Sequence, residues 1–539
     1  MTIIPVRGVG ELGVVSDYLP YDVPINAWAD ARNVRFKNRT VGVSSAFKKT
    51  KFSLTIGSQP MALLDATPPD GVRAIVCAQK SGALFQIRNN VQTDVSPTTP
   101  WIAATSRVTS TFLGSVIYLN NNENRPLYRA HPSIGAFSYV PGWASTDRAK
   151  TIRAYKDYLV ALDITKGTTL YPAMVKWSNA VQAGAPPSDW DVTSPSSHAG
   201  ETVLNDATGK LIDGLALGSS FILYGSNETY RMTFIGTPFI FEFEKLYDDL
   251  GVFAQDCAVE IEGKHYVFGK DGIYIHDGMS KVSISDQKVT DKIYSRIDFT
   301  RSERCFVFHN PVHKEIVFAY PSISSDAKWN INQVEGCNEA AVFNYADGTW
   351  SFIDLPGATC SVLMSLTSLV SWNDLATWNS ISATWRSFTG ADPYLPLLGV
   401  AGNPILSVGP SLVFYDNEAD GFLLNEMWTA FRFSGFVTTS IKDSDEFGAS
   451  LSTTKLIRTI HTQAMAQSMD SVINVYLGSA RNPYTPVNWK GPMVFQPSTD
   501  YKTDFNKTGR YLVIKYEFPV GSSAIISGYD IDLEILAQR

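Results

Sequence analysis

The chain has 539 residues, of which 44% are hydrophobic, 18% charged and 12% aromatic, and it carries a formal net charge of −7. This composition excludes an intrinsically disordered chain, a collagen and a coiled coil. The acidic balance argues against a basic protein that grips nucleic acid by its phosphates, and many aromatic residues with few charges favour β-sheets over helices.

The N-terminal segment, residues 1–50, is rich in positions that favour an extended backbone. Pro5, Pro20 and Pro24 each bias the residue before them away from helix. The segment is either an arm that reaches a neighbouring molecule or the first strand of a β-propeller that closes its ring of blades. Its start lacks a basic stretch followed by a long apolar run, so we expect no signal peptide.

Residues 51–355 contain short apolar or alternating runs bounded by Gly, Asn, Asp or Pro, which is the pattern of β-strands. The strands come in groups that start near Val72, Val108, Ile152, Leu215, Val259 and Cys305, with spacings of 36, 44, 63, 44 and 46 residues. A four-stranded propeller blade takes about 40 to 50 residues. We therefore predict about six blades, with an irregular double β-sandwich as the alternative.

Helical periodicity is scarce, and its best instance is Ser285 to Phe299, where Val289, Ile293 and Ile297 follow at intervals of four. Residues 356–452 read as a Trp-rich insertion or platform with the remaining blade strands, and Trp372, Trp378 and Trp385 mark it. Residues 453–539 contain alternating strands that predict a separate small β-sandwich. The predicted fold is thus all-β, with few short helices.

Five scattered cysteines, an odd number with no CxxC pair, exclude zinc ribbons and thioredoxin-type sites. We expect buried free thiols in a chain made in a reducing cytoplasm. No apolar stretch reaches 18 residues, so we expect no transmembrane helix and no membrane insertion. The cysteines are Cys77, Cys257, Cys305, Cys337 and Cys360.

Catalytic and cofactor motifs are missing from the sequence: it has no GxSxG, GxxxxGK[ST], GxGxxG after a strand, or HExxH. His309 and His313 flank an Asn-Pro turn, where their rings need not converge on a metal. Asn344 to Trp350 resembles one shortened sialidase Asp box, but a tight Asp347-Gly348 turn between two strands accounts for it. We predict no enzyme activity, no cofactor and no metal site.

The N-terminal segment carries, in this order, Leu19, Pro20, Pro24, Trp28, Asp30, Asn33, Arg35 and Phe36. This set of residues resembles the N-terminal signature of the tail nozzle proteins of short-tailed bacteriophages (podoviruses), also called tail tubular protein B or tail hub proteins. We expect Trp28 and Phe36 to be core anchors rather than contacts to another protein.

Further stretches resemble the same family in the same order, so the match extends along nearly the whole chain. They include Tyr155 to Leu162, Val175 to Ser178 with Trp177, Tyr230 to Gly236, Gly263 to Tyr274, and Gly509-Arg510-Tyr511.

The resemblance implies a β-propeller body and a smaller β-domain, assembled as a homo-hexamer in the virion tail after synthesis in the host bacterial cytoplasm. Such rings lie below the head-to-tail adaptor protein, continue the DNA channel, help to retain packaged double-stranded DNA, conduct it at ejection, and dock tail fibres or spikes. Two other hypotheses stay open: a glycan-binding or depolymerising propeller, and another β-rich virion component such as a fibre adaptor.

Overall fold

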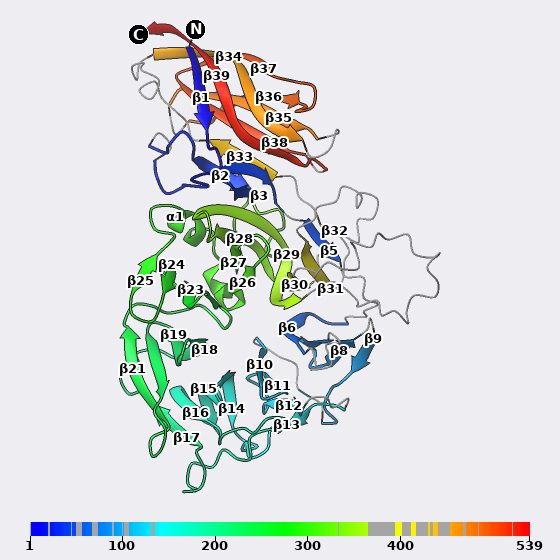
Figure 1. Ribbon diagram of the computed structural model, residues 1–539, viewed down its shortest axis with the longest axis vertical. Coiled ribbons are helices and arrows are strands. Elements are labelled where there is room, and N and C mark those ends of the chain that lie inside the picture. The colour runs from blue at the N-terminus through cyan, green and yellow to red at the C-terminus, as the bar shows by residue number, and fades with distance from the viewer. Residues whose placement is uncertain are drawn as a thin grey trace.

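The computed structural model describes residues 2–19, 22–44, 46–49, 57–66, 74–88, 91–99, 101, 107–130, 135–332, 334–364, 394–401, 411–416, 430–431, 435–439, 453–466, 471–482, 485–519 and 521–538. Within these ranges the chain forms 39 strands, one short α-helix and one 3₁₀ helix (Figure 1). The predicted all-β fold with a β-propeller body is confirmed. No helix in the described ranges is long and apolar enough to cross a membrane.

Five four-stranded antiparallel meanders follow one another along the chain and form blades 1 to 5 of the propeller (Figure 1). Blade 1 is β6 (Pro60–Asp65), β7 (Ala74–Gln79), β8 (Leu84–Arg88) and β9 (Val91–Asp94). Blade 2 is β10 (Thr109–Leu113), β11 (Val116–Asn120), β12 (Leu127–Ala130) and β13 (Ser138–Tyr139). Blade 3 is β14 (Arg148–Tyr155), β15 (Tyr158–Lys166), β16 (Thr169–Trp177) and β17 (Gly200–Val203). Blade 4 is β18 (Leu211–Leu217), β19 (Ser220–Gly225), β20 (Thr229–Phe234) and β21 (Phe241–Tyr247). Blade 5 is β22 (Ala258–Ile261), β23 (Lys264–Phe268), β24 (Ile273–His276) and β25 (Lys281–Ser283).

A sixth and a seventh blade share one long strand, β29 (Thr349–Met364). Its first half completes blade 6 with β26 (Phe306–Asn310), β27 (Glu315–Tyr320) and β28 (Cys337–Asn344). Its second half pairs with β30 (Leu395–Val400), and the sheet continues through β31 (Ser411–Asp416) to β5 (Ala46–Lys49) and β32 (Ala430–Phe431). The ring therefore has seven blades where the sequence predicted about six, and a strand from the N-terminal segment completes the seventh.

The first strand of each meander lies nearest the propeller axis, because β6, β10, β14, β18, β22 and β26 contact one another in sequence around the ring and β29 closes the ring onto β6. The group starts predicted at Val108, Ile152, Leu215, Val259 and Cys305 fall in or directly before these inner strands. Val72 lies outside the described residues, and blade 1 already begins at β6. The repeat spacing therefore located the inner strands of five blades.

The second domain is a sandwich of two sheets, built from both ends of the chain (Figure 1). One sheet contains β1 (Thr2–Arg7), β3 (Val34–Lys37), β4 (Thr40–Val43), β39 (Ala524–Gln538), β34 (Thr453–Ala466) and β37 (Thr503–Gly509). The other contains β2 (Trp28–Arg32), β33 (Gly435–Thr439), β38 (Tyr511–Phe518), β35 (Ile473–Ala480) and β36 (Asn488–Phe495). The sequence had predicted this sandwich from residues 453–539 alone. In the structure, four strands of the N-terminal segment complete it.

A single hydrophobic cluster runs from the sandwich into blades 4, 5 and 6. It includes Trp28 and Tyr516 from the sandwich, and Phe268 and Trp350 from the propeller. Burial of this continuous apolar surface stabilises both domains together. The sandwich is therefore packed firmly onto the propeller rather than tethered to it.

The predicted helix is shorter in the structure than in the sequence analysis. Helix α1 spans Thr290–Tyr294, and the 3₁₀ helix η1 spans Phe299–Arg304. Val289, Ile293 and Ile297 are all buried, as their spacing predicts, but Ile297 forms a β-bridge with Ser322 instead of continuing the helix.

The Trp-rich region and the cysteines complete the comparison with the sequence. Trp372, Trp378 and Trp385 lie outside the described residues, whereas Pro396 lies in β30. All five cysteines are buried, as predicted.

Candidate functional site

The N-terminal segment that resembles the nozzle signature forms the junction between the sandwich and the propeller. Four charged side chains meet at this junction, Arg32, Arg296, Glu339 and Asp354, each at most 13% exposed, and we call them the junction cluster. Trp28 opens β2 beside it, and its indole N–H donates a hydrogen bond to the carbonyl of Val9. The Trp28 ring meets Tyr516 edge-on, with centroids 6.3 Å apart, so this residue is a core anchor as predicted.

Arg32 links the last residue of β2 to two strands of blade 6. Its guanidinium donates to Glu339 Oε1 at 2.8 Å and to Asp354 Oδ1 at 3.2 Å. Glu339 and Asp354 are opposite each other across β28 and β29, and the Glu339 side chain is fully buried. Burial lowers the pKa of Arg32, but the two carboxylates raise it by more, so the guanidinium stays charged. Loss of the cation would leave two buried like charges face to face.

Asn33 makes a reciprocal pair with the same aspartate. Its side-chain N–H donates to Asp354 Oδ2 at 2.7 Å, and the backbone N–H of Asp354 donates to Asn33 Oδ1 at 2.9 Å. The Asn33 backbone is left-handed, with φ of 55°, which Asn tolerates better than most residues. The turn after β2 is therefore held to blade 6 by side chain and backbone together.

Three further signature residues add contacts around the junction cluster. Arg35 forms an ion pair with the buried Glu315 of β27, donating from Nη2 to Oε2 at 3.1 Å. Phe36 is buried, and Asp30 forms an ion pair with Lys292 of α1. Five of the predicted residues, Trp28, Asp30, Asn33, Arg35 and Phe36, thus come together in one place.

The other predicted residues lie elsewhere. Leu19 is exposed, Pro24 is partly buried, and Pro20 is outside the described residues. Trp177 ends β16 and packs edge-on against Phe241, and Gly236 follows β20 with φ of 82°.

In the sandwich, Gly509, Arg510 and Tyr511 form the passage from β37 to β38. The Arg510 guanidinium lies 5.3 Å from the centre of the Tyr511 ring. A Cβ on Gly509 would lie 2.6 Å from Cβ of Ser479, so only glycine fits this close approach.

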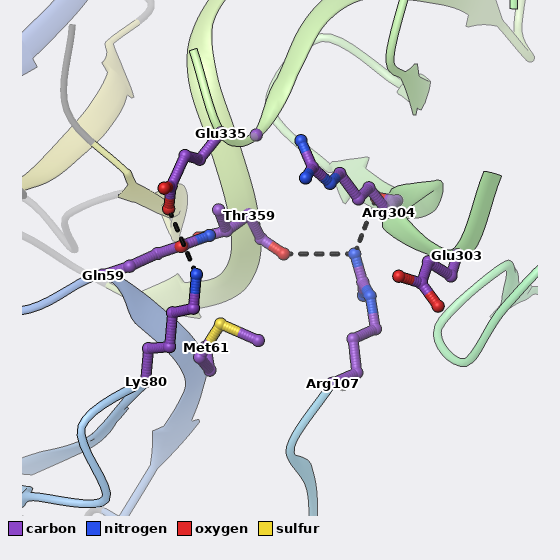
Figure 2. A pocket seen from close by; sticks show the side chains of 9 residues that line it. Gln59, Met61, Lys80, Arg107, Glu303, Arg304, Glu335 and Thr359 are labelled. Atoms are coloured by element: carbon purple, nitrogen blue, oxygen red, sulfur yellow. Dashed lines mark hydrogen bonds and ion pairs between the residues drawn. The ribbon is translucent and has the colours of Figure 1, made fainter. Parts of the chain in front are cut away.

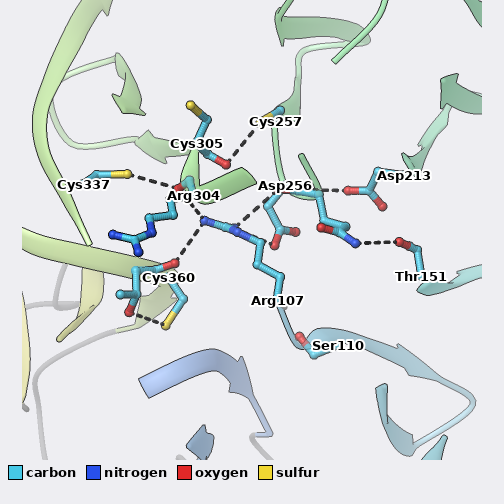
Figure 3. A network of polar contacts seen from close by, with 12 residues as sticks. Arg107, Ser110, Thr151, Asp213, Asp256, Cys257, Arg304, Cys305, Cys337 and Cys360 are labelled. Atoms are coloured by element: carbon cyan, nitrogen blue, oxygen red, sulfur yellow. Dashed lines mark hydrogen bonds and ion pairs between the residues drawn. The ribbon is translucent and has the colours of Figure 1, made fainter. Parts of the chain in front are cut away.

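A second set of polar residues links the inner strands of several blades, and we call Arg107, Arg153, Asp213 and Asp256 the axial network. Figure 3 shows Arg107, Asp213 and Asp256 of this network. Arg107 precedes β10 of blade 2, yet its Nη2 donates to the carbonyls of Arg304 at 3.0 Å and Thr359 at 3.1 Å. Its Nη1 faces Asp256 Oδ2 at 3.3 Å. One side chain thus joins blade 2 to blades 5, 6 and 7.

Arg153 adds a second bridge from blade 3. Its guanidinium donates to both oxygens of Asp213, at 2.7 and 2.8 Å, and to Asp256 Oδ1 at 2.7 Å. Burial lowers the pKa of Arg153, but Asp213 and Asp256 raise it by more, so this side chain also stays charged. The bidentate geometry makes this pair specific as well as strong.

Sequence analysis missed the axial network, although a signal was present. Arg107, Arg153, Asp213, Asp256 and Arg304 each stand within three residues of a predicted group start. A charged residue beside the inner strand of five successive blades is the pattern that would have found them. No comparable sequence pattern identifies the residues of the junction cluster, because Arg32, Arg296 and Glu339 are far apart in the sequence.

The comparisons with known proteins concern the fold. No family model and no curated protein sequence matches this chain. Among solved structures, the chain is similar to the WD40 β-propeller domain of Doa1, with a TM-score of 0.38, 7% identity, and coverage of 70% of this chain and 98% of that chain. It is also similar to the computationally designed Ika8 protein, with a TM-score of 0.35, 9% identity, and coverage of 69% and 99%.

Proposed function

We propose that this chain is the subunit of a hexameric tail nozzle of a short-tailed bacteriophage. In this role it is a structural virion protein below the head-to-tail adaptor. It continues the DNA channel, helps to retain packaged DNA, conducts it at ejection, and offers docking surface to tail fibres. The observation that carries the proposal is the junction, where the signature residues Trp28 to Phe36 join sandwich and propeller through buried contacts.

The junction matters because a ring under internal DNA pressure needs rigid subunits. Buried ion pairs and a shared hydrophobic core hold the two domains of each subunit in one orientation. Rigid subunits pass load from one neighbour to the next without bending at the domain boundary. We therefore explain the position of the signature residues at the domain boundary by the rigidity that such a ring requires.

The axial network bears on where DNA would pass. Arg107 joins blade 2 to blades 5, 6 and 7 among the inner strands of the propeller, so we assign the DNA path to the axis of the ring, between subunits. Six copies of a chain with net charge −7 carry −42 in total. A net negative charge of this size repels the phosphates of the duplex, which favours slippage over capture. The proposal includes no catalytic role and no cofactor.

Cryo-electron microscopy of purified tails tests the proposal. We expect a six-fold ring of this chain below the adaptor, with an axial hole and with the sandwich and propeller in the orientation that the junction fixes. Free monomers in solution are compatible with the proposal, because rings can form on the adaptor.

Two results would overturn the proposal. A single copy of the chain in the assembled tail would contradict it. Saturable binding or cleavage of host surface polysaccharide by a chain that is absent from the ring would favour the glycan-binding alternative instead.

A further inference from the structure

The propeller carries opposite net charges on two sides of its ring. Blades 1 and 2, residues 60–139, contain six Lys and Arg against four Asp and Glu, a net charge of +2. Blades 4 and 5, residues 211–283, contain five against eleven, a net charge of −6. Their outer strands lie on opposite sides of the ring, with β21 of blade 4 at the left and β9 of blade 1 at the right (Figure 1).

A cavity where the inner strands of blades 1, 2 and 6 begin does not add to this asymmetry (Figure 2). Lys80 points toward Glu335 there, with 3.5 Å between Nζ and Oε2. The cavity lining also contains Glu303 directly beside Arg304. Because these charges offset one another, the cavity favours no partner of either charge, and the outer strands are where charge can select one.

Blade 4 has the longest outer strand of the five meanders. This strand, β21, has seven residues, whereas β9, β13, β17 and β25 have two to four. Glu242 of β21 is exposed and has no ion pair with any described residue, and Asp248 and Asp249 directly after the strand are exposed as well. We call the turn before β21 together with the strand, residues 235–247, the blade 4 rim.

The turn of the blade 4 rim adds exposed apolar side chains to these acids. Residues 232–241 contain no charged side chain, and Ile235 and Phe239 are 51% and 72% exposed. The turn is held in place, because the N–H of Ile235 donates to the carbonyl of Ile240 at 3.1 Å and Phe234 packs against Tyr158. Exposed apolar patches mark interaction sites, and an aromatic side chain on a preorganised turn is typical of an interface anchor.

The surface that complements the blade 4 rim is on the same chain, in the outer part of blades 1 and 2. Arg125, just before β12, lies over the ring of Tyr139 at 4.1 Å and has no ion pair with any described residue. Opposite charges bring two surfaces together and fix their register. A closed ring needs two different patches on each subunit, because the subunit contacts its two neighbours through different sides.

We propose that the blade 4 rim docks against the outer strands of blades 1 and 2 in the next copy of this chain, with Phe239 as the anchor. The inference rests on the proposed hexameric ring and names the surfaces that close it. Each subunit presents its acidic side to one neighbour and its basic side to the other.

Photo-crosslinking in purified tails tests this contact. The full chain carries p-benzoylphenylalanine in place of Phe239, and mass spectrometry identifies the residues with which the probe reacts. We expect cross-links to residues 60–139 of a second copy. The matched control has the same probe in place of Phe299, which is 55% exposed on η1, and should give no such cross-link.

The possible failures separate the contact from the nozzle role. Cross-links from position 239 to another tail protein, or none in tails whose six-fold ring is visible by cryo-electron microscopy, would overturn the contact and leave the nozzle role standing. Equal cross-linking from position 299 would also overturn the contact. A tail without a ring of this chain would overturn both.

Charge reversal tests whether the partner is a second copy. Glu242→Lys and Arg125→Glu each place like charges at the contact, and we expect each to lower incorporation into tails by about 5-fold or more. Circular dichroism checks that both variants fold. The double variant restores opposite charges because both residues are on the same chain, so it should recover most of the parent level. A double variant as defective as the single ones would overturn the pairing of these two surfaces.

Discussion

The hydroxyl of Tyr224 lies 2.7 Å from Nδ1 of His265, and both residues are buried between blades 4 and 5. The same hydroxyl lies 2.7 Å from Nε2 of His276. His265 Nε2 faces the carbonyl of Ala216 at 2.8 Å, so Nε2 carries the proton and Nδ1 accepts from Tyr224. His276 Nδ1 accepts from the N–H of Gly278, so its Nε2–H donates to Tyr224. Each ring nitrogen has one partner, and both histidines must be neutral.

The buried pair His265 and His276 predicts that the free energy of unfolding decreases as the pH is lowered. Burial, together with the neighbouring His265, lowers the pKa of His276 to about 3, and burial also lowers the pKa of His265. Unfolded histidines titrate near 6.5. Below that pH the unfolded chain binds more protons than the folded one, so the free energy of unfolding decreases between about pH 6.5 and about pH 3.

Urea unfolding at about pH 7.5 and about pH 5 measures this effect. His276→Gln, which keeps an N–H donor but cannot be protonated, should lose less stability over that interval than the parent. An equal loss in both chains would show that His276 does not contribute.

Removal of the Tyr224 hydroxyl should be costly. Tyr224→Phe leaves the His276 Nε2–H without an acceptor and His265 Nδ1 without a donor, in a site closed to water. Each buried unsatisfied group costs about 1–3 kcal/mol, so we expect a loss of about 2 kcal/mol or more in urea unfolding.

The chain offers a matched control for this substitution. Tyr118 in blade 2 is equally buried, but its hydroxyl has no partner in the described part of the chain. Tyr118→Phe should therefore be neutral or stabilising. Equal losses from the two substitutions would mean that ring packing, and not the hydrogen bonds, decides the cost.

The junction cluster predicts that Arg32→Met is strongly destabilising. The substitution leaves Glu339 and Asp354 opposite each other without the cation between them, although Arg296 still reaches Glu339 at 3.2 Å. Breaking a buried ion pair from one side costs about 3–5 kcal/mol. Arg39→Met is the control, because its ion pair with Glu11 is exposed and should contribute less than about 1 kcal/mol. Similar free energies of unfolding for the two variants would contradict the role given to the cluster.

The repeat pattern in the sequence was informative because a blade is a local structure. Each meander pairs neighbouring strands, so the apolar runs near Val108, Ile152, Leu215 and Val259 mark inner strands directly. The sequence indicated remaining blade strands in residues 356–452 and a sandwich in residues 453–539. It did not indicate the N-terminal strands that complete both, because these pair with strands far away in the chain. The pairing of Lys48 with Phe414, for example, leaves no pattern in either segment alone.

The candidate site was predictable only in part, for a related reason. The signature residues stand close together in the sequence, and the resemblance located them. Their partners Glu315, Glu339 and Asp354 are ordinary acids on strands, and only the packing of β2 and β3 onto blade 6 shows what they contact.

The closure of the seventh blade gives the last prediction. Strand β5 pairs with β31 and β32, and its Phe47 is buried in a cluster that includes Phe306 and Phe308 of blade 6 and Leu398 of blade 7. Phe47→Ala should therefore cost about 3–5 kcal/mol and loosen the ring where its two ends meet. Hydrogen exchange should rise first in β30 and β31, and only later in β15 of blade 3, because local opening starts at the weakened contact. Val91→Ala, at an exposed position of β9, is the control and should leave exchange unchanged. Uniform acceleration across all blades would show instead that the propeller opens only as a whole.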